Sequence, residues 1–242
     1  MPSPSDRRGV FGWMLFDWAN QPFHTLIVTF LFAPYFAASV APDPVTGQAI
    51  WGAATAVAGA TVALSAPFLG AVADATGARK RWVAAFSIPY VAGCAGLWIA
   101  TPGMADPTAV LILFVLAYVG SEYTLVFTNA MLPDLAGRAE LGRVSGSGWA
   151  LGYLGGLAAL ALMLTLFAPA PGGTTTLIGV APLFGLDPAA GEPARMTGPL
   201  SALWFLVFAL PFFLFTPDAP ARAALALAAR AGLGAVGATV RA

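Results

Sequence analysis

Charged side chains are scarce in this sequence. Only 9% of its 242 residues are Asp, Glu, Lys or Arg, whereas a soluble domain carries about 25%. The formal net charge is zero, so no basic surface suggests a nucleic-acid partner. Together with a hydrophobic content of 59%, the shortage of charge places the chain in the membrane class and predicts the lipid bilayer as its surroundings.

Reactive side chains are also few. The single Cys94 cannot form an internal disulfide, and because it lies in an apolar run we interpret it as a small core residue. The only histidine is His24, and we find no metal-binding cluster, no phosphate-binding loop and no nucleophile–base pair in any loop. We therefore expect no cofactor, no metal and no enzymatic activity. The first apolar run is too long for a signal peptide, so we expect it to stay in the protein as a spanning helix.

Long apolar runs dominate what remains. A spanning helix needs about 20 mostly apolar residues, and six segments qualify, which predicts an all-α membrane protein. The first is longer than a membrane requires, so we expect it to be tilted or interrupted near Pro22 or Pro34. The predicted spans are Phe11 to Val40, Trp51 to Val72, Trp82 to Ala100, Thr108 to Met131, Ser147 to Phe167 and Gly198 to Phe215.

The basic residues predict the orientation. With the N-terminus in the cytoplasm, ten of the eleven basic residues fall on cytoplasmic segments and only Arg195 lies outside, which is a strong positive-inside bias. We thus expect a cytoplasmic segment 1–10, a membrane domain 11–216 and a cytoplasmic linker or surface helix 217–242, in the cell membrane. A frayed tail is an equal alternative for the last segment. We expect a surface loop rather than a re-entrant piece from Ala168 to Thr197.

Polar residues interrupt the first span. Asp17, Asn20, Gln21 and His24 follow one another at i, i+3, i+4 and i+7, so they share one helical face. Polarity at membrane depth is costly and therefore indicates function. We expect this face to line a bundle interior or an aqueous cavity, with His24 able to carry protons. Asp17 is near the cytoplasmic end, and an interfacial anchor is an equal alternative for it.

The fourth span carries one acid well inside it, Glu122, with Tyr118 and Asn129 on roughly the same face. A carboxylate at this depth must be protonated, paired or hydrated. We interpret Glu122 as a proton-coupling or substrate-contacting acid, and Asn129 as part of the same pathway. The alternative is a structural hydrogen bond to a neighbouring helix, such as to the polar face of the first span.

Glycines mark two further places. Gly148, Gly152 and Gly156 are spaced by four in the fifth span and predict close packing of another helix. The stretch 70–81, between the second and third spans, has an ordered pattern of glycine, acid and base. We expect Gly70 to permit close packing, Asp74 to cap a helix or pair with a cation, and Gly77 to adopt a positive φ. Arg79, Lys80 and Arg81 would hold this turn in the cytoplasm.

This turn resembles the signature between the second and third helices of the major facilitator superfamily. Gly70, Asp74, Gly77, Arg79 and Lys80 match the pattern, whereas Ala75 and Ala78 replace residues that are commonly basic. The stretches 17–20, 129–134 and 145–156 resemble the branch related to the vacuolar amino-acid effluxers of autophagy. The resemblance covers residues 11–217.

The resemblance implies a secondary transporter of small solutes such as amino acids that works by alternating access. It implies two inverted three-helix repeats, together half of a twelve-helix fold, with Asp74 acting as a cytoplasmic latch toward the other half. In order of preference, the chain would be a fragment, pair with a separately encoded half, or form a homodimer. The alternative function is a non-transporting membrane assembly subunit that packs against a partner through the fifth span.

Overall fold

The computed structural model describes residues 4–170 and 172–218, and for residues 4–6 and 74–76 it describes the backbone alone. Within these ranges all regular elements are helical, and six helices are long and apolar enough to cross a membrane. The chain is therefore an all-α integral membrane protein, as predicted. The spans are Arg7–Val40, Pro44–Ala73, Arg79–Ile99, Thr108–Leu135, Leu141–Phe167 and Glu192–Phe215.

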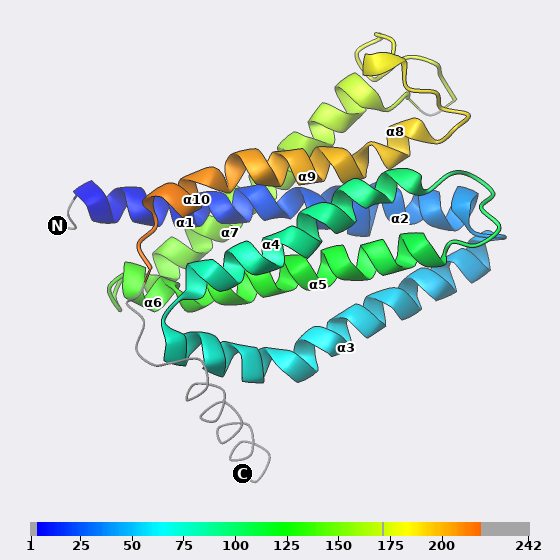
Figure 1. The fold of residues 1–242 in the computed structure, drawn as a ribbon. Helices are drawn as coiled ribbons and strands as arrows, with labels where there is room; N and C mark the ends of the chain where they lie inside the picture. Colours follow the sequence, from blue (N-terminus) through cyan, green and yellow to red (C-terminus); the bar gives the residue numbers. More distant parts are fainter. Residues whose placement is uncertain (1–3, 171, 219–242) are drawn as a thin grey trace.

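Each span is built from one long helix or from consecutive shorter ones (Figure 1). The elements are α1 (Pro4–Pro22), η1 (Phe23–Phe30), α2 (Phe32–Tyr35) and η2 (Phe36–Val40); α3 (Pro44–Thr76); α4 (Arg79–Gly96) and η3 (Leu97–Ile99); α5 (Thr108–Ala130) and α6 (Leu132–Leu135); α7 (Leu141–Leu162) and η4 (Met163–Phe167); η5 (Leu183–Gly185) in a loop; and α8 (Glu192–Arg195), α9 (Thr197–Phe208) and α10 (Leu210–Phe215).

Several helices begin earlier than hydropathy predicts. α3 begins at Pro44 rather than near Trp51, because the Asp43 carboxylate accepts hydrogen bonds from the backbone of Val45 and Thr46. Hydrogen bonding to Asp43 also lowers the pKa of its carboxyl group, and the largest contribution comes from the side chain of Thr46. The same correction applies to α1, which begins at Pro4 within the segment expected before Phe11. Hydropathy detects the apolar part of a helix, whereas helical hydrogen bonding continues into the polar interface.

The first span is interrupted, as its prolines predict. The α-helical part ends at Pro22 and continues as the π-helix η1, which contains His24. A second break occurs at Leu31, whose φ of −122° and ψ of −57° are not helical, three residues before Pro34. Because π-helical turns shift the register of side chains, the interruption reorients the span at the depth where its polar face ends.

The packing of the spans has an internal symmetry. α1 packs against α7 and against α9 and α10, α5 packs against α3 and α4, and α4 packs against α9. This set of contacts is unchanged when the first, second and third spans are exchanged with the fourth, fifth and sixth. Since successive spans run in opposite directions, the first and fourth spans are antiparallel, and the arrangement fits two inverted three-helix repeats.

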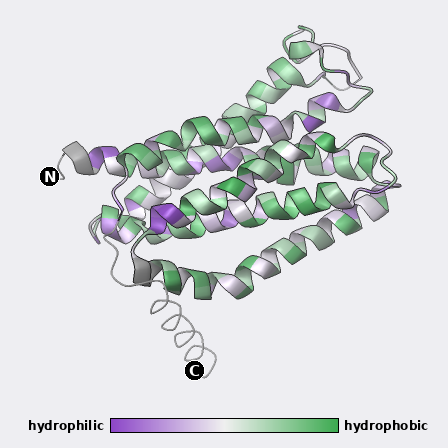
Figure 2. Cartoon of the chain, viewed as in Figure 1, coloured by the Kyte–Doolittle hydropathy of each residue, from purple (hydrophilic) through white to green (hydrophobic). Residues whose placement is uncertain are grey.

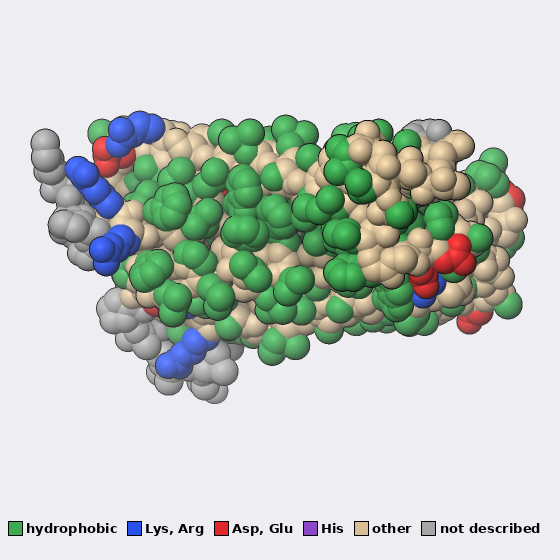
Figure 3. Space-filling view, turned by 90° about the horizontal axis from the view of Figure 1, so that it is seen from above, with side chains coloured by type: hydrophobic (Ala, Val, Ile, Leu, Met, Phe, Trp, Pro, Cys, Tyr) green, Lys and Arg blue, Asp and Glu red, His purple; other side chains and the backbone are tan. Residues whose placement is uncertain are grey.

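The outer surface suits lipid. Figure 2 shows hydrophobic residues along the whole length of the bundle, and exposed aliphatic side chains such as Leu64, Ile88 and Leu214 project from three different spans. On the face drawn in Figure 3, Lys and Arg gather at the end that carries the N-terminus, with a hydrophobic surface between the two ends. Cys94 is buried in the core, as predicted.

The glycine strip of α7 packs inside the chain. A Cβ atom on Gly155 would lie 2.8 Å from the carbonyl oxygen of Trp18, and one on Gly156 would lie 2.9 Å from Cγ of Gln21. Close packing of this strip is thus confirmed, but its neighbour is α1. The expectation that the strip is a binding surface for a helix of a separate partner is wrong, because α1 packs on it.

The segment expected to form a surface loop, Ala168 to Thr197, does so only in part. It projects beyond the ends of the helices (Figure 1), with Phe184 strongly exposed. Its last residues are helical instead, because α8 begins at Glu192. The buried Arg195 of α8 donates from Nε to the carbonyl oxygen of Trp98 at 2.6 Å and lies over the Trp98 ring, which joins the start of the sixth span to the end of the third.

Candidate functional site

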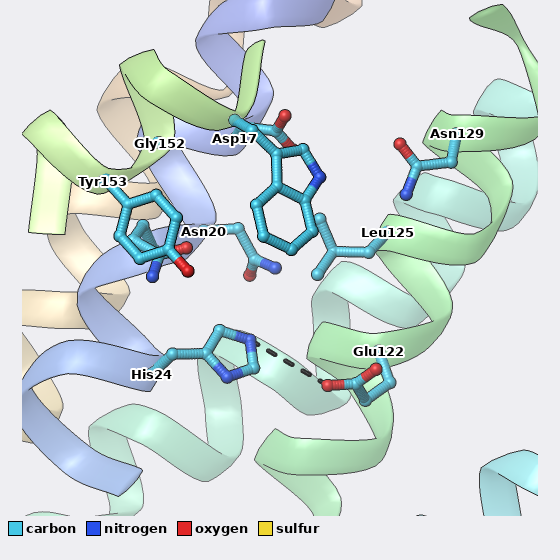
Figure 4. A pocket seen from close by; sticks show the side chains of 10 residues that line it. Asp17, Asn20, His24, Glu122, Leu125, Asn129, Gly152 and Tyr153 are labelled. Atoms are coloured by element: carbon cyan, nitrogen blue, oxygen red, sulfur yellow. Dashed lines mark ion pairs between the residues drawn. The ribbon is translucent and has the colours of Figure 1, made fainter. Parts of the chain in front are cut away.

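A polar cavity of about 420 Å³ lies between α1, α5 and α7. All six residues predicted for a substrate or proton pathway line it, although they come from two spans far apart in the sequence (Figure 4). The lining residues are Asp17, Asn20, Gln21, His24, Glu122, Leu125, Asn129, Trp149, Gly152 and Tyr153. The structure therefore brings the predicted set together, while its role in transport stays a prediction.

The first span supplies one wall of this cavity, which we call the polar pocket. Asn20 is 1% exposed, and its Oδ1 accepts a hydrogen bond from the hydroxyl of Ser121 at 3.1 Å. Within the described part of the chain, Asp17 Oδ2 and Asn20 Nδ2 are buried without a hydrogen-bond partner. An unpaired acceptor and an unpaired donor are costly in an apolar bundle, so their presence favours a binding role over a structural one.

His24 and Glu122 face each other across the pocket. His24 Nε2 lies 4.0 Å from Glu122 Oε1 and 3.3 Å from Ser121 Oγ. The side chains of His24 and Glu122 are 26% and 30% exposed, so both reach the space of the pocket. The distance to Glu122 suits an ion pair but is too long for a hydrogen bond. A structural hydrogen bond to a neighbouring helix was the alternative role for Glu122. Such a bond to the polar face of the first span is made by Ser121, the residue before Glu122.

α7 supplies the third wall with aromatic side chains that the sequence analysis did not assign to the site. Trp149 and Tyr153 are 61% and 57% exposed, and their ring centroids lie 5.9 Å apart. Their i, i+4 spacing beside the glycine strip is the signal that could have identified them. Two glycines of the strip make room for the acid: a Cβ atom on Gly148 would lie 2.9 Å from Asp17 Oδ2, and one on Gly152 would lie 3.2 Å from Asp17 Cβ.

The turn between α3 and α4 is the second predicted site. Gly77 follows the end of α3 with a φ of 68°, which confirms the positive φ expected there. The expectation for Gly70 is wrong, because a Cβ atom there would meet nothing within 4 Å. The side chain of Asp74 lies outside the described residues, so its predicted latch role stays a prediction.

The bases of this turn contact distant parts of the same chain. Arg79 forms a salt bridge with Asp134 of α6. Lys80 Nζ donates to the carbonyl oxygens of Phe213 and Thr216, both at 2.8 Å, at the end of α10. A lysine at this position neutralises the negative end of a helix dipole. The start of α4 is thus tied to the ends of the fourth and sixth spans on one side of the membrane.

Comparison with known proteins identifies the family. Residues 38–238 match the family described as "Vacuole effluxer Atg22 like". The chain belongs to this family. The resemblance of 129–134 and 145–156 to vacuolar effluxers is thereby confirmed, whereas 17–20 precedes the matched residues.

This Atg22-like chain is also 29% identical over 150 residues to a protein of Bacillus subtilis (strain 168) named "Uncharacterized MFS-type transporter YxiO". The aligned segment covers 59% of this chain and 34% of that relative, so the match spans about a third of the relative's length. No solved structure matches the chain significantly. The name of this relative agrees with the resemblance of the 70–81 turn to the major facilitator superfamily.

Proposed function

We propose that this Atg22-like bundle belongs to a secondary transporter that moves small solutes across a membrane by alternating access, with the polar pocket as its solute path. The single observation that carries the proposal is that one pocket in an apolar bundle gathers two acids, a histidine and three amides from two spans. Such groups are rare in membrane spans and are found where solutes or ions pass. The resemblance to effluxers implies amino acids as the solutes.

Proton coupling is assigned to His24 and Glu122. A histidine changes charge near neutral pH, and its Nε2 is 4.0 Å from the Glu122 carboxylate. A small side-chain movement brings the two groups within proton-transfer distance. In this proposal, the proton held by the pair changes the charge of the pocket and so alternates with solute binding.

The exposed aromatic wall suggests how the pocket would be closed. Trp149 and Tyr153 project from α7 beside the pocket rather than into the packed core. We propose that a second six-span bundle, in the same protein or in another copy, covers this wall and completes the site. The turn that Arg79 and Lys80 connect to the fourth and sixth spans would then lie next to the interface at which the two bundles move against each other. The alternative function, a membrane assembly subunit, loses its predicted binding surface, because α1 covers the glycine strip.

Orientation completes the proposal. The end of the bundle that carries the N-terminus and the 70–81 turn is the end where basic side chains gather in Figure 3. The positive-inside rule places this end in the cytoplasm, and the cell membrane is the location we propose. Cysteine-accessibility labelling of a single cysteine at Arg138 against one at Asp106, in a variant lacking Cys94, would test the assignment.

Uptake into proteoliposomes tests the transport proposal. A panel of labelled amino acids and amines would first identify a solute moved by the protein in its active assembly. Glu122→Gln and His24→Ala should then lower proton-driven accumulation by at least about tenfold, the size typical of a lost proton-transfer group. The matched control is Glu140→Gln, an exposed acid paired with Arg143 outside the polar pocket. Unchanged accumulation in both pocket variants would remove the coupling roles of His24 and Glu122.

A further inference from the structure

The polar pocket is acidic. Asp17 and Glu122 are its two carboxylic acids, and no Lys or Arg is among the described residues that line it. His24 is the one lining side chain that can carry a positive charge, and its Nε2 faces Glu122 at 4.0 Å. A protonated His24 therefore compensates Glu122 and leaves Asp17 without a cation. With both acids ionised, the pocket has a net negative charge whichever form His24 takes.

The unpaired polar atoms of α1 define what a bound solute must offer. Asp17 Oδ2 is an acceptor and Asn20 Nδ2 is a donor, both buried and without a partner among the described residues. Asp17 and Asn20 are one helical turn apart, a spacing that separates Cβ atoms by about 5–6 Å. A single small molecule can therefore reach both, if it carries a cationic donor for Asp17 and an oxygen acceptor for Asn20.

The aromatic wall adds a third requirement. Trp149 and Tyr153 of α7 line the same pocket as Asp17, and both rings are more than half exposed. Aromatic faces attract cations and also pack against apolar or aromatic groups. They make no strong interaction with a carboxylate, so this wall favours the cationic and the apolar parts of a solute.

We infer that the polar pocket selects a cationic amine that carries a neutral oxygen acceptor and an apolar or aromatic body. The inference rests on the proposed transport of small solutes, and it replaces the amino acids that the resemblance implies with a different substrate class. The ammonium group binds Asp17, the oxygen accepts from Asn20 Nδ2, and the body packs on Trp149 and Tyr153. A carboxylate on the solute would approach two acids with no free cation among the described lining residues of this bundle, which disfavours anions and, less strongly, zwitterionic amino acids.

Three molecules of the same size separate these cases. Phenylalaninol is an amine with a neutral hydroxyl, phenylalanine is a zwitterion, and 3-phenylpropionate is an anion. We would measure their binding to the protein in lipid nanodiscs by isothermal titration calorimetry. Phenylalaninol should bind at least about tenfold more tightly than phenylalanine, because both carry the ammonium group for Asp17 but only phenylalanine brings a carboxylate toward the two acids. The anion should bind more weakly than either.

Variants connect the preference to the pocket. Asp17→Asn should weaken phenylalaninol about tenfold or more and reduce its advantage over phenylalanine, whereas Asp106→Asn, an acid in the loop before α5, should change neither. Equal or tighter binding of phenylalanine or 3-phenylpropionate overturns the amine assignment but leaves the pocket as a solute site. Absence of binding by all three overturns it as well. The transport proposal fails separately, through uptake that is insensitive to Glu122→Gln and His24→Ala.

Discussion

The two sides of α1 differ in the chemistry of the side chains that they carry. One side packs on α9 and α10 through aromatic rings: Phe16 lies 5.5 Å from Phe205 and 4.8 Å from Phe212, centroid to centroid, and Trp18 stacks on Trp204 at 5.7 Å. The other side carries the polar face that lines the pocket with α5 and α7. The aromatic side is closely packed and its indole donor Trp204 Nε1 bonds the Trp18 carbonyl oxygen at 3.1 Å.

The difference separates the side of α1 that packs the bundle from the side to which we assign transport. Aromatic pairs in contact stabilise a bundle beyond the burial of their area. Unpaired polar atoms such as Asp17 Oδ2 and Asn20 Nδ2 do the opposite. A helix that only had to pack would carry apolar residues on both sides. The polar side of α1 is thus the part that stability alone does not explain, and substitutions on the two sides should have different consequences.

The largest loss of stability should come from the aromatic side. Phe16 is fully buried against Phe205 and Phe212, so Phe16→Ala leaves a cavity between α1 and the sixth span. We expect the free energy of unfolding to fall by about 3 kcal/mol, the lower end of the range for Phe→Ala, because lipid tails are as apolar as the core. Thermal unfolding in detergent measures it. Phe11→Ala is the control, since Phe11 is 55% exposed; an equal loss there would contradict a specific packing role.

An intermediate effect should come from the seam between α1 and α7. Gly155→Ala places a methyl group 2.8 Å from the Trp18 carbonyl oxygen, and this backbone atom cannot move without shifting α1. We expect a loss of about 1–3 kcal/mol from overpacking. Gly146→Ala on the same helix is the matched control, because a Cβ atom there meets nothing within 4 Å, and it should be neutral or slightly stabilising. The same unfolding assay decides, and equal stability of the two variants would show that α1 and α7 are less closely packed than described.

The sequence predicted the six spans and the polar face of α1 because both depend on residue spacing along one helix. It also predicted that Glu122 and Asn129 share a face, but it offered contact of Glu122 with α1 only as an alternative, since that contact depends on packing between distant spans. Gly148, Gly152 and Gly156 were recognised as a packing surface, yet a strip of small residues does not identify its neighbour. Gly70 shows the limit of motif reading: its place in a family pattern suggested a close contact that the structure does not contain.

The smallest loss of stability should come from the polar side, and there the effect on transport should be large. Asn20→Leu keeps the branched shape of the side chain next to the open space of the pocket and removes one hydrogen bond, to Ser121, which still lies 3.3 Å from His24 Nε2. Hydrogen bonds between membrane helices contribute about 0.6 kcal/mol on average, so we expect stability to change by less than about 1 kcal/mol. Uptake should nevertheless fall at least about tenfold, because the donor offered to the solute is lost.

Gln48→Leu removes an exposed amide that does not line the polar pocket and should alter neither property. If Asn20→Leu instead destabilises the protein as much as Phe16→Ala, or leaves uptake unchanged, the two sides of α1 do not divide stability from function.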